Sequence, residues 1–237
     1  MSVINIIRKI LNPLKMDLKI YPNLDLRRRI KLLEHYKITK ILDVGANNGQ
    51  YAKQTYLLGY KREIISFEPV KSVFNELKKS ASKNKIWSVH NFGLGDKEEE
   101  LEINISKNTF SSSLLDIMQD HVEGAPESQY THKEKIQIKK LDDIFSKITH
   151  KNDKVFLKMD VQGFEENVIK GAKESLKFIE GIQLEMSLEE LYKGEILFDD
   201  VIKLVKSFGF KLYSLENGFY NEKTGRLLQV DGIFFKN

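Results

Sequence analysis

The feature that most limits the possible folds of this chain is a change of pattern at Lys40. From there on, short apolar segments alternate with longer segments in which apolar residues recur at helical spacing. This alternation is typical of a parallel sheet built from strand–helix–strand units, and so of an α/β fold. Strands are expected at residues 41–44, 64–67, 86–90, 155–159, 182–186, 210–215 and 229–235.

Helices are expected between these strands, at residues 50–58, 70–80, 164–176 and 199–208. One stretch, residues 106–135, is irregular, and two alternating segments flank it at 101–105 and 136–139. We expect these two segments to pair as an inserted hairpin that carries a long loop, and such loops on compact domains are often functional. No repeat or linker divides residues 40–237, which are therefore expected to form a single domain.

Residues 1–39 precede this pattern and are expected to form a helical extension. A short amphipathic helix is predicted near residues 3–12, ended by Pro13. Such a helix can dock on an anionic membrane surface, but it more often packs on its own domain or on a second copy of the chain, so a weak membrane contact and a homodimer both stay open. A second helix is expected at 24–36, and its basic run, residues 27–29, is interpreted as a solvated face.

Composition removes several classes of function. The chain has no cysteine, which excludes disulfides, thiolate zinc sites, iron–sulfur clusters and a cysteine nucleophile. Its net charge of +4 is small and dispersed, unlike the basic stripe of a nucleic-acid-binding domain. No apolar run reaches the roughly 18–20 residues of a membrane span, and Arg8 and Lys9 interrupt the apolar N-terminal stretch, so a cytoplasmic protein is expected.

The strongest local motif is residues 43–51, Asp-Val-Gly-Ala-Asn-Asn-Gly-Gln-Tyr, where a strand enters a glycine turn and then a helix. This is the setting of a nucleotide-cofactor loop, but the spacing lacks the additional glycine that lets a pyrophosphate approach the backbone. S-adenosylmethionine has no phosphate. Asp43 suits its cationic end, and the turn from Gly45 to Gly49 lets it lie against the backbone. Glu68 follows the next strand, about 20 residues on, where a carboxylate can accept both ribose hydroxyl protons.

Polar residues follow other strands at the same predicted edge. Asn91 comes after the third strand and is a candidate for reading an adenine amino group, with a simple turn residue as the alternative. Lys158 and Asp160 face the same way, so Lys158 can orient Asp160 as a catalytic base; a structural ion pair is the alternative. Glu185, after the fifth strand, is the substitute base.

The inserted loop contains three consecutive serines, Ser111, Ser112 and Ser113, which are candidates for binding a polar substrate. A helix cap or a serine turn is the alternative interpretation. His121 and His132 lie in the same region without metal-ligand spacing and are expected to be exposed. No metal ligands are predicted, although a divalent ion that helps to remove the hydroxyl proton stays open.

Together these motifs resemble the FkbM family of S-adenosylmethionine-dependent methyltransferases. The matching segments are residues 43–51, which include Asn47 and Tyr51, together with 67–69, 141–142, 157–165 and 230–235. Residues 110–114 and the Gln162 form of the fourth-strand motif resemble one bacterial branch in particular. The resemblance implies a class I methyltransferase (Rossmann-like) seven-stranded sheet in the order 3-2-1-4-5-7-6, with helices on both faces and the last strand antiparallel. It adds Asn47 and Tyr51 to the cofactor-binding residues.

The resemblance also implies O-methylation of hydroxyls on sugars or other natural products. We therefore expect an S-adenosylmethionine-dependent O-methyltransferase that acts on a sugar or glycan precursor, as in polysaccharide biosynthesis. A lipid or secondary-metabolite hydroxyl as acceptor, and a non-catalytic cofactor-binding protein, are the alternatives. A nucleic-acid N-methyltransferase is weaker, because no Asn-Pro-Pro-Tyr or Asp-Pro-Pro-Tyr segment occurs. An NAD-dependent oxidoreductase is the last alternative.

Overall fold

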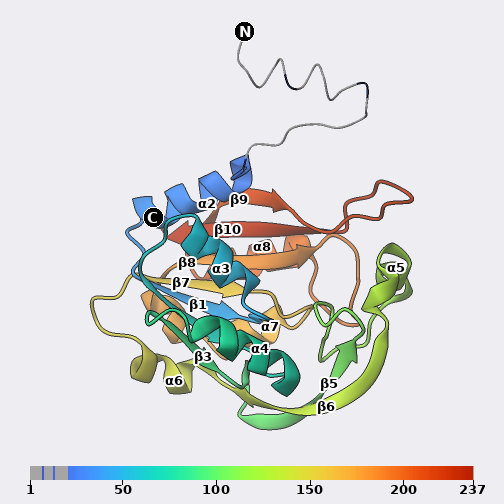
Figure 1. Cartoon of the computed structure of the whole chain (residues 1–237), viewed down its shortest axis with the longest axis horizontal. Helices are drawn as coiled ribbons and strands as arrows, with labels where there is room; N and C mark the ends of the chain where they lie inside the picture. The colour runs from blue at the N-terminus through green and yellow to red at the C-terminus, as the bar shows by residue number, and fades with distance from the viewer. Residues whose placement is uncertain (1–6, 8–12, 14–20, 237) are drawn as a thin grey trace.

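A seven-stranded mixed sheet forms the centre of the molecule in a computed structural model that describes residues 7, 13 and 21–236 (Figure 1). The strand order is β3-β2-β1-β7-β8-β10-β9, with β10 antiparallel to both neighbours. The strands are β1 (Lys40–Val44), β2 (Glu63–Phe67), β3 (Trp87–His90), β7 (Val155–Met159), β8 (Ile179–Ser187), β9 (Phe210–Asn217) and β10 (Gln229–Lys236). Numbered by themselves, they give the order 3-2-1-4-5-7-6, so the predicted fold class is confirmed.

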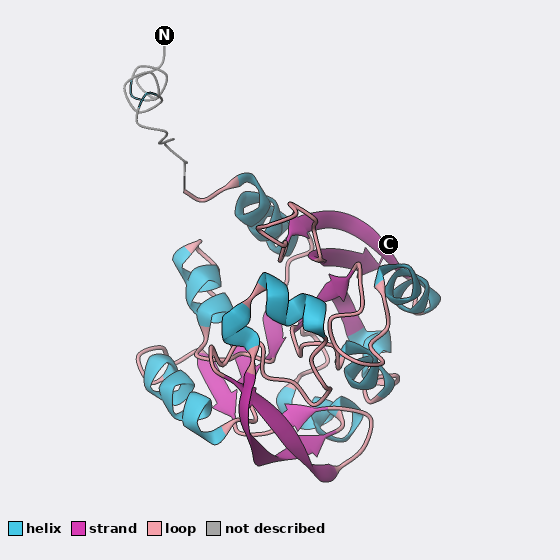
Figure 2. Ribbon diagram, turned by 90° about the vertical axis from the view of Figure 1, so that its right-hand side faces the viewer, coloured by secondary structure: helices cyan, strands magenta, loops and turns pink. Residues whose placement is uncertain are grey.

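Helices cover both faces of this sheet (Figure 2). One core contains residues of α6 (Leu141–Ile148), α7 (Glu165–Lys170) and α8 (Phe198–Ser207), and the other contains residues of α2 (Leu24–His35), α3 (Gln50–Leu57) and α4 (Lys71–Ala81). Successive residues of the central strands point into opposite cores, as Phe156 and Leu157 do. Because both faces are covered, β1 and β7 are buried along their whole length, which explains why most of their residues are apolar; their charged residues, Lys40, Asp43 and Lys158, are buried with them.

The predicted inserted hairpin is confirmed and is longer than expected. β5 (Glu99–Ser106) and β6 (Tyr130–Lys139) pair antiparallel, and the two-residue β4 (Gly93–Leu94), not predicted from the sequence, adds to β6 to make a second sheet. The loop between β5 and β6 contains the short helices α5 (Gln119–Gly124) and η2 (Pro126–Ser128). Isoleucines of β5 and β6 pack against Val70 and Val73, which fixes the insertion beside the carboxyl end of β2.

The predicted amphipathic helix at residues 3–12 lies, except for Ile7, outside the described residues. The second predicted helix exists as α2, and it shares a core with the sheet: Leu33 packs in that cluster, and the Tyr36 ring stacks on Phe235 at 3.9 Å between centroids. The division of the chain near residue 39 stays a prediction.

The helix expected at 164–176 is shorter than predicted. α7 ends at Lys170, and the chain continues through Gly171 to the 3-10 turn η3 (Ser175–Phe178). A Cβ atom at Gly171 would lie 1.8 Å from the carbonyl oxygen of Gly95. Only a glycine lets the segment after β4 pack this closely against the end of α7. The local helical pattern of the sequence does not reveal this contact.

Candidate active site

A cavity of about 770 Å³ lies at the carboxyl ends of β1, β2, β7 and β8, and the insertion forms its opposite wall. Open α/β sheets bind ligands at this edge. Toward the insertion the lining is mostly apolar, with Val70, Leu94, Ile138 and Phe164. Toward the β8 side it is polar and acidic, with these residues: Arg29, Tyr51, Lys158, Asp160, Gln183, Glu185 and Asp231.

The glycine turn after β1 is shaped by contacts with the protein itself. Gly45 and Gly49 both have positive φ, of +73° and +86°. A Cβ atom at Gly45 would lie 1.9 Å from the carbonyl oxygen of Asp160, and one at Gly49 would lie 2.5 Å from the Trp87 ring. Gly45 lines the cavity, as predicted, whereas Gly49 does not. Both glycines make room for parts of the protein, the end of β7 and Trp87, and their predicted contact with a cofactor stays a prediction.

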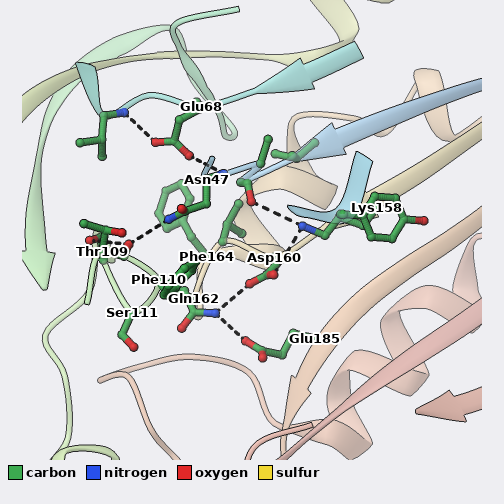
Figure 3. A pocket seen from close by; sticks show the side chains of 18 of the residues that line it. Asn47, Glu68, Thr109, Phe110, Ser111, Lys158, Asp160, Gln162, Phe164 and Glu185 are labelled. Carbon is green, nitrogen blue, oxygen red and sulfur yellow. Dashed lines mark hydrogen bonds and ion pairs between the residues drawn. The ribbon is translucent and has the colours of Figure 1, made fainter. Parts of the chain in front are cut away.

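Glu68 is the residue that best fits a nucleoside. It lines the cavity with only 5% of its surface exposed. Oε2 accepts from the backbone N–H of Asn47 at 2.9 Å, and Oε1 accepts from that of Val70 at 2.8 Å. Burial raises the pKa of this carboxyl to about 7, although the two backbone donors act in the opposite direction. Each oxygen keeps acceptor capacity, so the pair can receive the two hydroxyls of a ribose (Figure 3).

Asn47 and Tyr51 both line the cavity, as the resemblance implies. The Asn47 side-chain amide donates to the carbonyl of Thr109 at 3.2 Å, which ties the glycine turn to the inserted loop. The Tyr51 ring lies beneath two cations, with the Lys158 Nζ at 5.4 Å and the Arg29 guanidinium carbon at 5.2 Å from its centroid. Burial raises the pKa of its hydroxyl.

Asp43 and Asn91 do not line the cavity, and their predicted contacts with a cofactor stay predictions. Asp43 is fully buried; it accepts from the Ser66 hydroxyl at 2.9 Å and forms an ion pair with Lys158 at 3.3 Å. In this structure it is the counter-ion of Lys158. The Asn91 amide donates to the carbonyls of Glu68 and Pro69, so it is the turn residue given as the alternative.

The predicted catalytic residues do lie together. Lys158 Nζ is 3.4 Å from Asp160 Oδ2, and 42% of the Asp160 side chain is exposed. Burial alone would lower the pKa of Lys158, but the charges of Asp160 and Asp43 outweigh it and raise this pKa. Burial raises the pKa of Glu185, and the nearby Asp160 and Asp231 raise it further. Glu185 therefore favours its protonated form more strongly than an exposed glutamate does.

The three serines have different positions. Ser111 and Ser112 line the cavity, and Ser112 donates to the carbonyl of Thr109 at 3.0 Å. Ser113 is buried outside the lining, and its hydroxyl donates to the backbone carbonyl of Gln162 at 2.6 Å. This hydroxyl fastens the inserted loop to the segment after β7, and its predicted contact with a substrate stays a prediction.

Arg29 was interpreted as part of a solvated face, and this was wrong. It is buried, lines the cavity and forms an ion pair with Glu216, while Nη1 donates to Gln54 at 3.3 Å. A sequence signal existed, because Arg29 lies between Leu26 and Leu33 on the buried side of α2.

His121 was expected to be exposed, and this too was wrong. Only 3% of it is exposed; its ring packs against Tyr192 and Phe219 at the cavity wall, and burial lowers its pKa to about 4. The expectation holds for His132, whose side chain is on the surface beside Glu134. Nothing in the periodicity of the loop sequence distinguishes the two.

Among residues 7, 13 and 21–236, no three His, Asp or Glu side chains are grouped in a way that could hold a metal ion. Within the same residues, no helix is long and apolar enough to cross a membrane.

The strand order, the glycine turn after β1 and the acid after β2 define a class I methyltransferase. The family model of the methyltransferase FkbM domain matches residues 43–212. The chain therefore belongs to this family of S-adenosylmethionine-dependent methyltransferases. The 2-O-methyltransferase NoeI of Sinorhizobium fredii is 24% identical over 192 residues, which cover 78% of this chain and 79% of that protein.

Similar solved structures are more distant in sequence. Methyltransferase FkbM from Methylobacillus flagellatus is 15% identical with a TM-score of 0.46, and the match covers 82% of this chain and 43% of that one. This chain thus spans less than half of that protein. The magnesium protoporphyrin IX methyltransferase of Synechocystis is 10% identical with a TM-score of 0.48, covering 100% of this chain and 98% of that one.

Proposed function

We propose that the protein is an O-methyltransferase that methylates a hydroxyl of a sugar or glycan precursor. The observation that carries this proposal is the position of Asp160: a partly exposed carboxylate at the cavity, next to the glycine turn and held by Lys158. A base at this place suits an acceptor that must lose a proton, as a hydroxyl must. The 2-O-methyltransferase name of the Sinorhizobium relative supports a hydroxyl acceptor.

The residues present fit S-adenosylmethionine. Glu68 would hold the ribose hydroxyls, the apolar wall with Val70, Leu94 and Ile138 would enclose the adenine, and the Gly45 turn would border the methionine portion. When bound, this cofactor supplies an electrophilic methyl group on a sulfonium. The nearby residues orient the acceptor, exclude water and take the proton.

Asp160 and Glu185 have different tasks in this proposal. Asp160, paired with the buried Lys158, accepts the hydroxyl proton of the acceptor. Glu185, whose pKa is raised by burial and by neighbouring carboxylates, stays protonated and can donate a hydrogen bond to a second acceptor oxygen. Two carboxyls in different environments are a common basis for dividing acid and base work.

The charges at the cavity favour an uncharged acceptor. Among the described residues, the cavity is lined by one arginine and one lysine, and both already form ion pairs. Arg29 pairs with Glu216, and Lys158 pairs with Asp43 and Asp160. A phosphate or carboxylate close to the reacting hydroxyl would therefore meet the acidic side of the cavity without a free counter-ion. A neutral sugar, or one with an amino group, avoids this cost.

The test is a transfer assay with methyl-labelled cofactor and a panel of acceptors: neutral glycosides, their uronic acid and phosphorylated counterparts, and a long-chain alcohol. We expect label in an O-methyl ether of a neutral sugar, identified by mass spectrometry. Label only on the long-chain alcohol would support the lipid alternative, and label on nitrogen would contradict a hydroxyl acceptor. Cofactor binding without transfer to any glycan fraction would support a non-catalytic protein. The cytoplasmic location, the homodimer, the weak membrane contact and the role in polysaccharide biosynthesis stay predictions.

A further inference from the structure

We infer that Gln162 is a positioning residue of this site, which aligns Asp160 and Glu185 for proton removal and fastens them to the inserted loop. This inference rests on the proposed function, because it concerns the same transfer. Figure 3 shows the Gln162 amide between the two carboxyl groups.

The first support is the use of both amide hydrogens. Gln162 Nε2 donates to Asp160 Oδ1 at 2.8 Å and to Glu185 Oε2 at 2.8 Å. An amide nitrogen donates two hydrogen bonds and accepts none, so both carboxyl oxygens must accept. The arrangement leaves Asp160 held on one oxygen by Lys158 and on the other by Gln162. Its orientation toward the cavity is thereby fixed from two sides.

The second support is that Gln162 is itself held in place. Its Oε1 accepts from the hydroxyl of Tyr192, a fully buried side chain. Its backbone carbonyl accepts from Ser113 of the inserted loop at 2.6 Å. Its φ is +54°, which is uncommon for a residue other than glycine, and Gly163 follows at +92°. A Cβ atom at Gly163 would lie 2.9 Å from Cβ of Tyr192, so the turn and Tyr192 fit closely.

These contacts connect the inserted loop to the catalytic carboxyls through one residue. Ser113 and the cavity-lining Ser111 and Ser112 are consecutive, so a shift of this loop on binding an acceptor acts directly on the Gln162 backbone. If Gln162 had only a structural role, its hydrogen bonds would stabilise the fold but would not affect catalysis through Asp160. The two roles differ in how a Gln162 substitution combines with a change at Asp160.

The experiment is a double-mutant cycle on kcat with Gln162→Met and Asp160→Asn. Methionine has a similar shape but no donor. We expect Gln162→Met to lower kcat about tenfold or more in the wild-type background and by less than twofold in the Asp160→Asn background. The KM for the acceptor and the Kd for S-adenosylhomocysteine should change by less than threefold. Gln137→Met, at an exposed glutamine of β6, is the matched control and should leave kcat unchanged.

Ser113→Ala is the second variant and removes the hydroxyl that donates to the Gln162 carbonyl and accepts from the backbone N–H of Leu115 at 3.0 Å. It should lower kcat severalfold, and less than that when combined with Gln162→Met. Equal losses of Gln162→Met in both Asp160 backgrounds, or a kcat within twofold of wild type, would overturn the inference alone. If Gln162→Met does not fold, Ser113→Ala decides alone. An unchanged kcat of Ser113→Ala overturns the inferred coupling between the inserted loop and the carboxyls, and a reduced kcat supports it. A wild-type protein that transfers methyl to no hydroxyl acceptor overturns both proposals.

Discussion

Binding of the cofactor should depend on pH through Glu68. Burial raises the pKa of this carboxyl to about 7, and the backbone donors of Val70 and Asn47 only partly offset that effect. A ribose diol donates its hydroxyl hydrogens and therefore binds the ionised carboxylate. Below the pKa of Glu68, binding must then be accompanied by loss of a proton.

The size of this effect follows from the pKa. With a value near 7, about a tenth of Glu68 is ionised at pH 6 and about nine-tenths at pH 8. Affinity should therefore be about tenfold weaker at pH 6, which is ~1.4 kcal/mol. The same shift affects folding with a definite sign. Because the folded pKa lies above the ordinary value of 4.5, the folded protein binds more protons between these two values, and the contribution of Glu68 to stability is lost as pH rises from about 4.5 to about 7.

The measurement is isothermal titration calorimetry with S-adenosylhomocysteine at pH 6, 7 and 8, in buffers of different ionisation enthalpy. We expect release of nearly one proton at pH 6 and little at pH 8. Glu68→Gln is the control: it should bind more weakly by about 1.5–3 kcal/mol at pH 8 and lose the pH dependence. Equal wild-type affinity at pH 6 and pH 8, or the same slope in Glu68→Gln, would refute the assignment.

Three further substitutions test the same contacts. Asp160→Asn should lower kcat by about 10²–10⁴ while the Kd for S-adenosylhomocysteine stays within a few-fold, and near-normal turnover would remove it as the base. Gly45→Ala should lower the free energy of unfolding in urea by at least about 2 kcal/mol more than Gly59→Ala does. Both glycines have positive φ, but only the Cβ atom added at position 45 would meet a backbone oxygen, at 1.9 Å. Equal losses of stability in the two variants would contradict this. Arg29→Met should lower the free energy of unfolding by about 3–5 kcal/mol, because it leaves Glu216 buried and unpaired. Adding Glu216→Leu should restore most of this stability. An additive loss in the double variant would argue against the ion pair.

The local apolar pattern and the family motifs were sufficient to predict the fold class and the order of strands in the main sheet. The predominantly apolar sequences of β1 and β7 are predictable because a parallel strand covered on both faces has no solvent-exposed side. Glu68 and the Gly45 turn were also found from the sequence. Each directly follows a strand, and the carboxyl ends of parallel strands meet at one edge, so chain continuity alone places them there.

The use of each polar side chain was decided only in the tertiary structure. Asp43, Asn91 and Ser113 have the residue type and chain position expected of site residues, but each forms a hydrogen bond with a neighbouring residue and none lines the cavity. The two glycines of the turn are required by contacts with Asp160 and Trp87, which are distant in sequence.

Conversely, Arg29 and Gln162 belong to the site through partners that no local pattern reveals. Arg29 meets Glu216 across 187 positions of the chain, and Gln162 meets Tyr192 and Glu185 from different elements. A buried polar group must find a hydrogen-bond partner, but the sequence does not say which distant segment supplies it. The period of burial is a local property of the chain, whereas the pairing of buried polar groups depends on how the strands and helices meet.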